Sequence, residues 1–166
     1  SWLRVNALLR EVIATSPAAR DVRAGTLEAA ARWFGEHDQP AAAVRCALAA
    51  GTSPDAVRLV TGWGPALVRS GEADVVLDAV ARVPSADRSP EVHRLEGDAR
   101  QLVGEWDAAV ACYERAAAAT PGPLDAGLAW RWGLIHHLRG DLDTALAVYG
   151  RGALDDADDS TADTLT

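Results

Sequence analysis

Three pairs of glycines recur along this chain, and the two glycines of each pair are seven residues apart. The pairs are Gly64 and Gly71, Gly97 and Gly104, and Gly133 and Gly140. The first two pairs are offset by 33 residues and the last two by 36. A fixed period in this range is typical of helix pairs stacked in a row, because one pair alone cannot bury its apolar face. The pattern therefore predicts an all-α chain, an α-α superhelix of antiparallel helix pairs.

Residues around these glycines repeat with them. Three residues recur after 36 positions, Ala109 as Ala145, Tyr113 as Tyr149 and Arg115 as Arg151. Gly97 would lie inside a helix, where glycine costs roughly 1 kcal/mol relative to alanine, so we expect a close approach of the partner helix at Ala109. Gly104 falls where the first helix must end in a left-handed turn. We expect Tyr113 to pack between this pair and the next.

The apolar periodicity predicts about nine helices joined by short connections, which makes sequential helices antiparallel neighbours. A first amphipathic helix is predicted at residues 2–14. Ser-Pro pairs at 16–17, 53–54 and 89–90 resemble an N-cap followed by the first helical residue. The other predicted helices span residues 18–36, 40–50, 54–70, 72–83, 90–103, 105–119, 124–139 and 141–153.

Composition limits the class of protein. The chain has 166 residues, of which 49% are hydrophobic, and a net charge of -8. We expect one acidic domain that buries a core and repels nucleic-acid phosphates. Because the chain contains no methionine, we interpret it as part of a longer protein. No apolar run reaches the ~18–20 residues that span a bilayer, and no signal peptide is evident, so we expect a cytoplasmic location without membrane contact.

The spacing of the repeat resembles the tetratricopeptide repeat. That family has small residues at the 8th, 20th and 27th positions, a frequent glycine at the 15th, an aromatic at the 24th and a proline at the 32nd. Counted from Pro90, these positions hold Gly97, Ala109, Ala116, Gly104, Tyr113 and Pro121. The resemblance implies one helical-repeat domain over residues 1–166, with repeats at 57–89, 90–123 and 126–157. It also implies a degenerate repeat at 23–56, with Ala30, Ala42, Cys46 and Ala49 in register, and an acidic tail at 155–166.

A second resemblance covers the first half of the chain. VNALLREV (5–12) and AAARWFGEHDQPAAAVRCALAAG (29–51) are similar to a region of the large LuxR-type, MalT-like signal-transducing ATPases that regulate transcription. There the first motif closes a winged-helix part, here 1–15, and the second opens a helical-repeat sensor. The chain departs from that family at Asn6-Ala7, where His-Pro is usual. The resemblance implies a ligand-sensing or protein-interaction module, with ATP bound only by an upstream domain and DNA by a downstream one.

No motif indicates an enzyme, a metal or a cofactor. The chain lacks a phosphate-cradling GxxxxGK[ST] loop and a GxSxG nucleophile motif. His136 and His137 are adjacent and point about 100° apart on a helix, so they do not easily share one ion. The aspartates after residue 155 lack the glycine and glutamate of a calcium loop. We expect Cys46 and Cys112 to be small buried apolar side chains, and the sequence leaves a disulfide between them open.

Tryptophan supplies the candidate recognition surface. Trp33, Trp63 and Trp132 lie on apolar helical stripes, which predicts core positions. Trp130 falls at the fifth position of its repeat, which faces the concave groove in tetratricopeptide proteins. The same interpretation places a polar set suited to recognition on that surface: Arg58, Thr61, Arg69, Glu91, Arg94, Asp98, Gln101, Trp130 and His137. The alternative is an ordinary polar helix face with one exposed aromatic.

We predict binding without catalysis. A protein partner or a small-molecule inducer would occupy the concave groove and shift the parent regulator between an autoinhibited and a self-associating state. We expect no direct nucleic-acid binding by this part of the protein. Two alternatives remain, a stand-alone tetratricopeptide scaffold for protein-protein interaction and a helical appendage of an enzyme. The flanking gene sequence distinguishes them.

Overall fold

The described chain is built from α-helices. The structure is a computed structural model that describes residues 17–51 and 53–152, and no β-strand occurs in that part of the chain. The helices are α2 (Pro17–Glu36), α3 (Pro40–Ala50), α4 (Ser53–Arg69), α5 (Ala73–Val80), α6 (Pro90–Leu102), α7 (Trp106–Ala118), α8 (Ala126–Leu138) and α9 (Leu142–Tyr149), with a 3-10 helix at Ser85–Asp87. These bounds confirm the predicted helices to within a few residues. The predicted helix at 2–14 lies outside the described residues.

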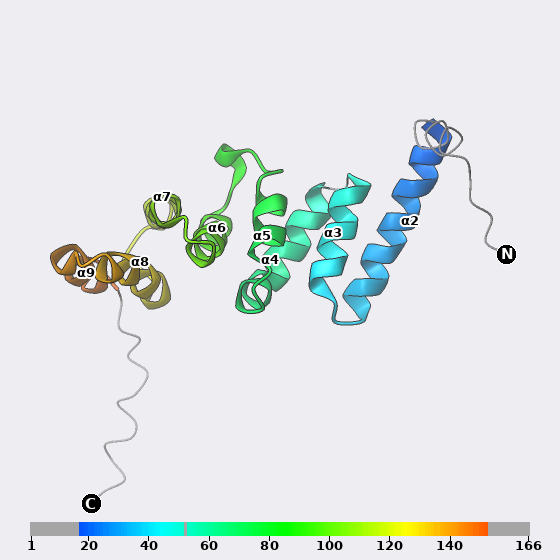
Figure 1. The fold of residues 1–166 in the computed structure, drawn as a ribbon. Coiled ribbons are helices and arrows are strands. Elements are labelled where there is room, and N and C mark those ends of the chain that lie inside the picture. Colours follow the sequence, from blue (N-terminus) through cyan, green and yellow to red (C-terminus); the bar gives the residue numbers. More distant parts are fainter. Residues whose placement is uncertain (1–16, 52, 153–166) are drawn as a thin grey trace, which may run out of the picture. The chain divides into compact units, whose positions relative to one another are not determined.

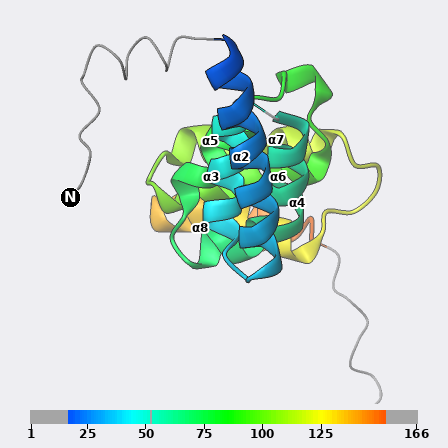
Figure 2. The ribbon, with the colours of Figure 1, turned by 90° about the vertical axis from the view of Figure 1, so that its right-hand side faces the viewer.

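The helices are grouped in two compact units that divide after Ser85. Unit 1 contains α2–α5 and unit 2 contains α6–α9. Within each unit, successive helices pack as neighbours, α2 on α3, α4 on α5, α6 on α7 and α8 on α9 (Figure 1). In the view of Figure 2, α2 lies in front of α3 and α4. None of the helices formed by the described residues is long and apolar enough to cross a bilayer.

Left-handed residues mark the turn inside each helix pair. Gly71, Gly104 and Gly140 follow α4, α6 and α8 with φ of 84°, 83° and 80°. Glycine adopts this conformation without the steric cost of a Cβ atom. The turn between α2 and α3 uses Asp38 instead, with φ of 53°. These four residues fix the register of the four helix pairs.

The register of the first pair differs from the prediction by one residue. Counting back from Asp38 as from the three turn glycines starts the repeat at Ala24 and not at residue 23. The buried small residues are Ala31, Ala43 and Ala47, whereas the predicted set was Ala30, Ala42, Cys46 and Ala49. The prediction was wrong because no glycine marks this turn in the sequence.

Aromatic rings fill the space above two helix glycines. Gly97 and Gly133 lie inside α6 and α8 and are buried, as predicted. A Cβ atom on Gly97 would lie 2.7 Å from Cδ1 of Tyr113, and one on Gly133 would lie 2.6 Å from Cδ1 of Tyr149. The predicted close approach is therefore present, and the nearest atoms belong to the tyrosine rings. Ala109 is fully buried in the same core cluster as Tyr113, and the Tyr113 ring comes nearest to Gly97.

Each unit has its own core. In unit 2, Tyr113 belongs to a buried cluster that also contains Leu128 and Trp132 of α8, so it does pack between successive pairs. In unit 1, a smaller cluster around α2 consists of Ala31, Ala47 and Ala56. Trp132 is a core residue, as predicted.

Trp33 corrects the expectation that it would lie in the core, because its side chain is 49% exposed. Ala31 is the α2 residue that faces the core, and a position two residues later points about 200° away around the helix. The Trp33 ring instead stacks on the ring of His37 at a centroid distance of 4.0 Å.

Candidate functional site

The residues predicted for the inner groove lie on the first helices of helix pairs, and they are divided between the units. Unit 1 carries Arg58, Thr61 and Arg69 on α4, and unit 2 carries Glu91, Arg94, Asp98 and Gln101 on α6 and Trp130 and His137 on α8. Two separate candidate surfaces follow, one in each unit.

The side chains of Asp98 and Gln101 contact other side chains of unit 2. The hydroxyl oxygen of Tyr113 lies 3.0 Å from Oδ1 of Asp98 and 2.8 Å from Oε1 of Gln101. Arg131 of α8 brings its Nε atom to 3.2 Å from the same Asp98 oxygen. Burial raises the pKa of Asp98 above its ordinary value, although the charge of Arg131 and the hydrogen bond from Tyr113 act in the opposite direction. This network holds α6, α7 and α8 together, so two of the predicted groove residues support the fold.

Trp130 is the exposed aromatic residue of α8. Its side chain is 59% exposed, which fits the expectation that it is not a core residue. Its ring stacks on Tyr149 with a centroid distance of 5.6 Å and an interplanar angle of 25°. His137 is also exposed, while His136 lies 3.5 Å from the carboxylate of Asp141. Among the described residues, no group of three or more side chains is arranged to hold a metal ion.

A buried polar cluster on α6 was not anticipated from the sequence. Glu96 is 4% exposed, and its carboxylate lies 2.7 Å from Arg88 and 2.9 Å from Arg100. Burial alone would raise the pKa of Glu96, but the hydrogen bond from Arg100 and the charge of Arg88 hold it below its ordinary value. His93 is also buried, and its Nδ1 atom has no hydrogen-bond partner. Charged residues recur throughout α6, so the sequence offered no signal that these two face inward.

The cysteines lie in different units and are both free. Cys46 of α3 is half-buried and Cys112 of α7 is buried. Burial raises the pKa of the Cys112 thiol, and the nearby charge of Glu96 acts in the same direction. A high thiol pKa disfavours the reactive thiolate, so Cys112 is suited to packing.

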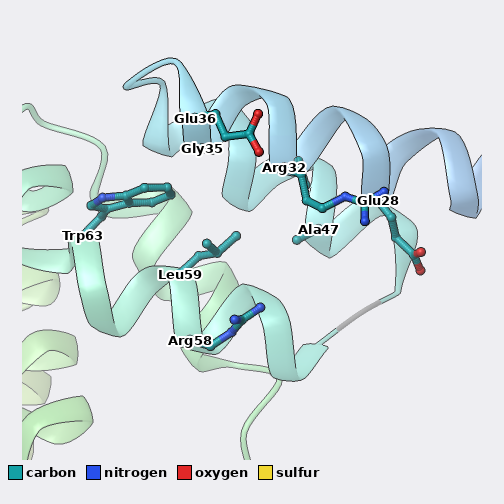
Figure 3. A pocket seen from close by; sticks show the side chains of 9 residues that line it. Glu28, Arg32, Gly35, Glu36, Ala47, Arg58, Leu59 and Trp63 are labelled. Carbon is teal, nitrogen blue, oxygen red and sulfur yellow. The ribbon is translucent and has the colours of Figure 1, made fainter.

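Unit 1 contains a cavity of about 390 Å³ between α2, α3 and α4. This volume lies within the ~300–1,000 Å³ typical of small-molecule sites. Figure 3 shows α2 on one side of the open space and Leu59 and Trp63 of α4 on the other. The complete lining is Glu28, Ala31, Arg32, Gly35, Glu36, Ala47, Arg58, Leu59 and Trp63. Of the predicted groove residues, only Arg58 belongs to it.

The cavity lies where unit 2 has an aromatic ring. Ala47 and Tyr113 both come nine residues after the turn residue of their pair, and Ala31 and Gly97 both come seven before it. The Tyr113 ring covers Gly97, whereas the methyl group of Ala47 is too short to cover Ala31 in the same way. An alanine at the aromatic position therefore leaves open space next to α2.

The α4 wall of the cavity also matches unit 2. Leu59 and Trp63 correspond in register to Leu128 and Trp132 of α8, which pack against Tyr113 in the core cluster. Without a tyrosine between them, Trp63 of α4 approaches α2 directly, and a Cβ atom on Gly35 would lie 3.1 Å from its Cη2 atom. Trp63 is thus a half-buried wall of the cavity, where the sequence predicted an ordinary core position.

Known proteins offer no guide to what this cavity binds. Comparison of the chain with models of protein families, with curated proteins and with solved structures finds no match.

Proposed function

We propose that the chain is a non-catalytic binding module that takes up a small molecule in the cavity of unit 1. The observation that carries this proposal is the lining of the cavity, in which an apolar floor is surrounded by charged side chains from α2 and α4. An apolar pocket with a few converging polar groups is the usual form of a ligand site. In unit 2, Tyr113 fills the corresponding space. Both units therefore leave room between the first helices of successive pairs, and this supports a functional use of the room that stays open in unit 1.

Ligand binding in this cavity would act on the arrangement of helices. A molecule that contacts α2, α3 and α4 together stabilises the arrangement in which all three contacts are made. At a ligand concentration of 100 Kd, the added stability is about 2.7 kcal/mol. A ligand that binds two arrangements equally well would shift nothing. Ligand binding would therefore change the relative populations of two helix arrangements of the module.

We further propose that the parent protein is a LuxR-type, MalT-like transcription regulator located in the cytoplasm. The support for this step is the resemblance of residues 29–51, and this segment forms α3 and the second half of α2, which together supply much of the cavity lining. ATP would be bound by an upstream domain and DNA by a downstream one. Sequencing the surrounding gene tests this step. An open reading frame that encodes neither a nucleotide-binding loop upstream nor a helix-turn-helix downstream contradicts it.

A panel of small molecules tests the binding proposal. Sugars, nucleotides, amino acids and carboxylic acids are added singly, and the thermal midpoint of the chain is measured. We expect at least one class to raise the midpoint in a concentration-dependent manner. The variant Ala47→Tyr, made together with Ala31→Gly so that the new ring meets no Cβ atom at residue 31, places a ring in the cavity and should fold and lose this response. The control is Ala49→Tyr, an exposed position on the same helix, which should keep it.

The outcomes separate a cavity ligand from surface binding. A response that survives in this double variant places the ligand elsewhere, and no response from any class contradicts the small-molecule function. Circular dichroism of the variant with Ala31→Gly and Ala47→Tyr should match that of the parent chain, because Gly97 and Tyr113 form the same pair in unit 2.

Protein binding is a second candidate function, favoured by the exposed Trp130–Tyr149 stack of unit 2. Tryptophan and tyrosine are enriched where proteins bind one another, because their rings bury a large area at a low entropy cost. A partner would cover the indole of Trp130. A hydrogen-exchange comparison of α8 with and without a candidate partner tests this function.

A further inference from the structure

The side chains that line the cavity of unit 1 restrict the chemical class of ligand that it can bind. Its floor consists of Ala31, Gly35 and Ala47, and the indole of Trp63 forms one wall. This surface has no charged group, so the part of the ligand that lies on it is apolar. The volume of about 390 Å³ is at the low end for ligand sites. One ring with short substituents fits this space better than an oligosaccharide or a nucleotide does.

The shape of the floor points to an aromatic ring. In unit 2, the phenol of Tyr113 lies over Gly97 and packs beside Trp132. Unit 1 has Ala31 in place of Gly97 and Trp63 in place of Trp132, and it supplies no ring of its own. A planar ring from a ligand would pack beside Trp63 as Tyr113 packs beside Trp132, but further from the α2 backbone because of the Ala31 methyl group, and aromatic pairs add favourable contact beyond the area they bury.

The charged residue next to the cavity floor in unit 1 has the opposite sign to the corresponding residue of unit 2. Asp98, which accepts from the Tyr113 hydroxyl, comes six residues before its turn residue. The corresponding residue of unit 1 is Arg32, and Arg58 adds a second guanidinium from α4 (Figure 3). Guanidinium groups bind carboxylates through charge-assisted hydrogen bonds. The ligand should therefore carry a carboxylate near its ring.

The two glutamates of the lining complete the charge pattern. Glu28 and Glu36 lie one helical turn on either side of Arg32 on α2. A ligand with a carboxylate alone would leave both glutamates close to its negative charge. An ammonium group next to the carboxylate would instead meet one glutamate while the carboxylate meets an arginine. The lining of two acidic and two basic side chains matches a zwitterion.

We propose that the cavity binds a free aromatic α-amino acid. The ring lies on the floor against Trp63, the carboxylate faces Arg32 and Arg58, and the ammonium group faces Glu28 or Glu36. This assignment rests on the proposed small-molecule function and names the ligand class of the same cavity. An aromatic residue inside a peptide lacks the two charges, so the free amino acid is the source that the lining favours.

The test uses L-phenylalanine as the probe and the chain labelled with ¹⁵N. Titration should shift the indole N–H signal of Trp63, identified by its loss in Trp63→Phe, and leave the signal of Trp130 in place. Three compounds serve as comparisons: phenethylamine lacks the carboxylate, 3-phenylpropanoate lacks the ammonium group and glycine lacks the ring. Each should bind at least about ten-fold more weakly than L-phenylalanine, and so should N-acetyl-phenylalanine amide, which stands for a peptide residue.

Variants locate the carboxylate contact. Arg32→Gln should weaken L-phenylalanine binding about ten-fold or more, while Arg23→Gln, an exposed arginine of the same helix outside the cavity, should leave the Kd unchanged. Equal weakening by both variants, or tight binding of phenethylamine, would overturn the proposed orientation. Binding of 3-phenylpropanoate as tight as that of L-phenylalanine would overturn the role of the glutamates.

The result also separates this inference from the broader function. If a sugar, a nucleotide or an aliphatic acid raises the thermal midpoint and the double variant with Ala31→Gly and Ala47→Tyr abolishes the effect, the cavity is a ligand site but the aromatic amino acid is wrong. If no class of small molecule produces an effect that the double variant removes, both statements fail.

Discussion

The helices α2–α4 of unit 1 and α6–α8 of unit 2 follow the same repeat register but differ in what fills the space between the first helices of successive pairs. Unit 2 fills it with the Tyr113 ring, which is fully buried. Unit 1 has Ala47 at the corresponding position and a cavity of about 390 Å³ beside it. The position nine residues after the turn residue thus holds a ring where this space is core and a methyl group where it is a cavity.

The comparison also explains why unit 2 is the poorer candidate for a ligand pocket. Tyr113 uses its hydroxyl to engage Asp98 and Gln101, and Arg131 closes the network from α8. These polar groups are already paired, so a ligand would have to replace existing hydrogen bonds. In unit 1, four charged side chains border a cavity of about 390 Å³.

The largest effect should come from Tyr113→Ala, which gives unit 2 the residue type of unit 1. We expect a loss of ~3–5 kcal/mol of unfolding free energy, because a fully buried ring is removed and a cavity is left. Urea denaturation of both chains measures it. Tyr149→Ala is the control, because Tyr149 is only half-buried and should cost less. A loss below about 1 kcal/mol for Tyr113→Ala would show that the two regions do not differ as described.

Gly97→Ala tests the contact between Gly97 and the Tyr113 ring by changing the glycine. Its Cβ atom would collide with the Tyr113 ring, and overpacking of this kind costs ~1–3 kcal/mol. The matched control is Gly62→Ala in α4, where a Cβ atom meets nothing within 4 Å. That change should stabilise the chain by ~0.5–1 kcal/mol, because alanine suits a helix better than glycine. Equal effects of both changes would contradict the proposed ring contact.

His93 provides a pH-dependent difference between the units. Burial lowers its pKa below the ordinary 6.5, with further lowering by the charges of Arg115 and Arg88 and an opposing effect of Glu96. Because the unfolded chain binds this proton more readily, stability from His93 is present above pH 6.5 and is lost as the pH falls below it.

The corresponding residue of α4 is Val60, also buried, so His93→Val tests the difference. Thermal midpoints of the variant should fall less between pH 7 and pH 5 than those of the parent chain. His137→Gln, at an exposed position of α8, should retain the full dependence. A slope that is the same in parent and His93→Val would assign the pH dependence to other groups.

The smallest effect on stability is expected for Trp130→Ala. The residue is mostly exposed, and its ring stacks on Tyr149, so the loss should be below about 1 kcal/mol. Differential scanning calorimetry measures the change. A loss as large as that of Tyr113→Ala would make Trp130 a core residue and remove the surface proposed for a protein partner.

Much of the fold could be predicted from the glycine spacing. The turn glycines and the helix glycines have clear physical roles, and Ser89 caps α6 through a contact to the Val92 N–H as its Ser-Pro motif indicates. The Tyr113 ring was not predicted as the nearest neighbour of Gly97, because spacing alone does not tell which side chain of the partner helix is long enough to reach the glycine.

The candidate site was less accessible to sequence reasoning. The cavity lies where unit 1 has Ala47 and unit 2 has an aromatic residue. This difference can be recognised only when Asp38 is known to be the turn residue. The predicted surface included Arg58 but not Arg32, because the prediction drew on α4, α6 and α8 and included no residue of α2. Asp98 and Gln101 were read as exposed recognition groups, because the sequence does not show that a tyrosine hydroxyl engages them.

The aspartate at the α2–α3 turn has a cost that the three glycine turns do not have. A side chain in left-handed conformation costs on the order of 1 kcal/mol relative to glycine, although aspartate tolerates it better than most residues. The α2–α3 turn is consequently the one of the four turns where glycine would suit the backbone better than the residue present. Replacing Asp38 by glycine would remove this local cost and leave every side chain of the cavity lining in place.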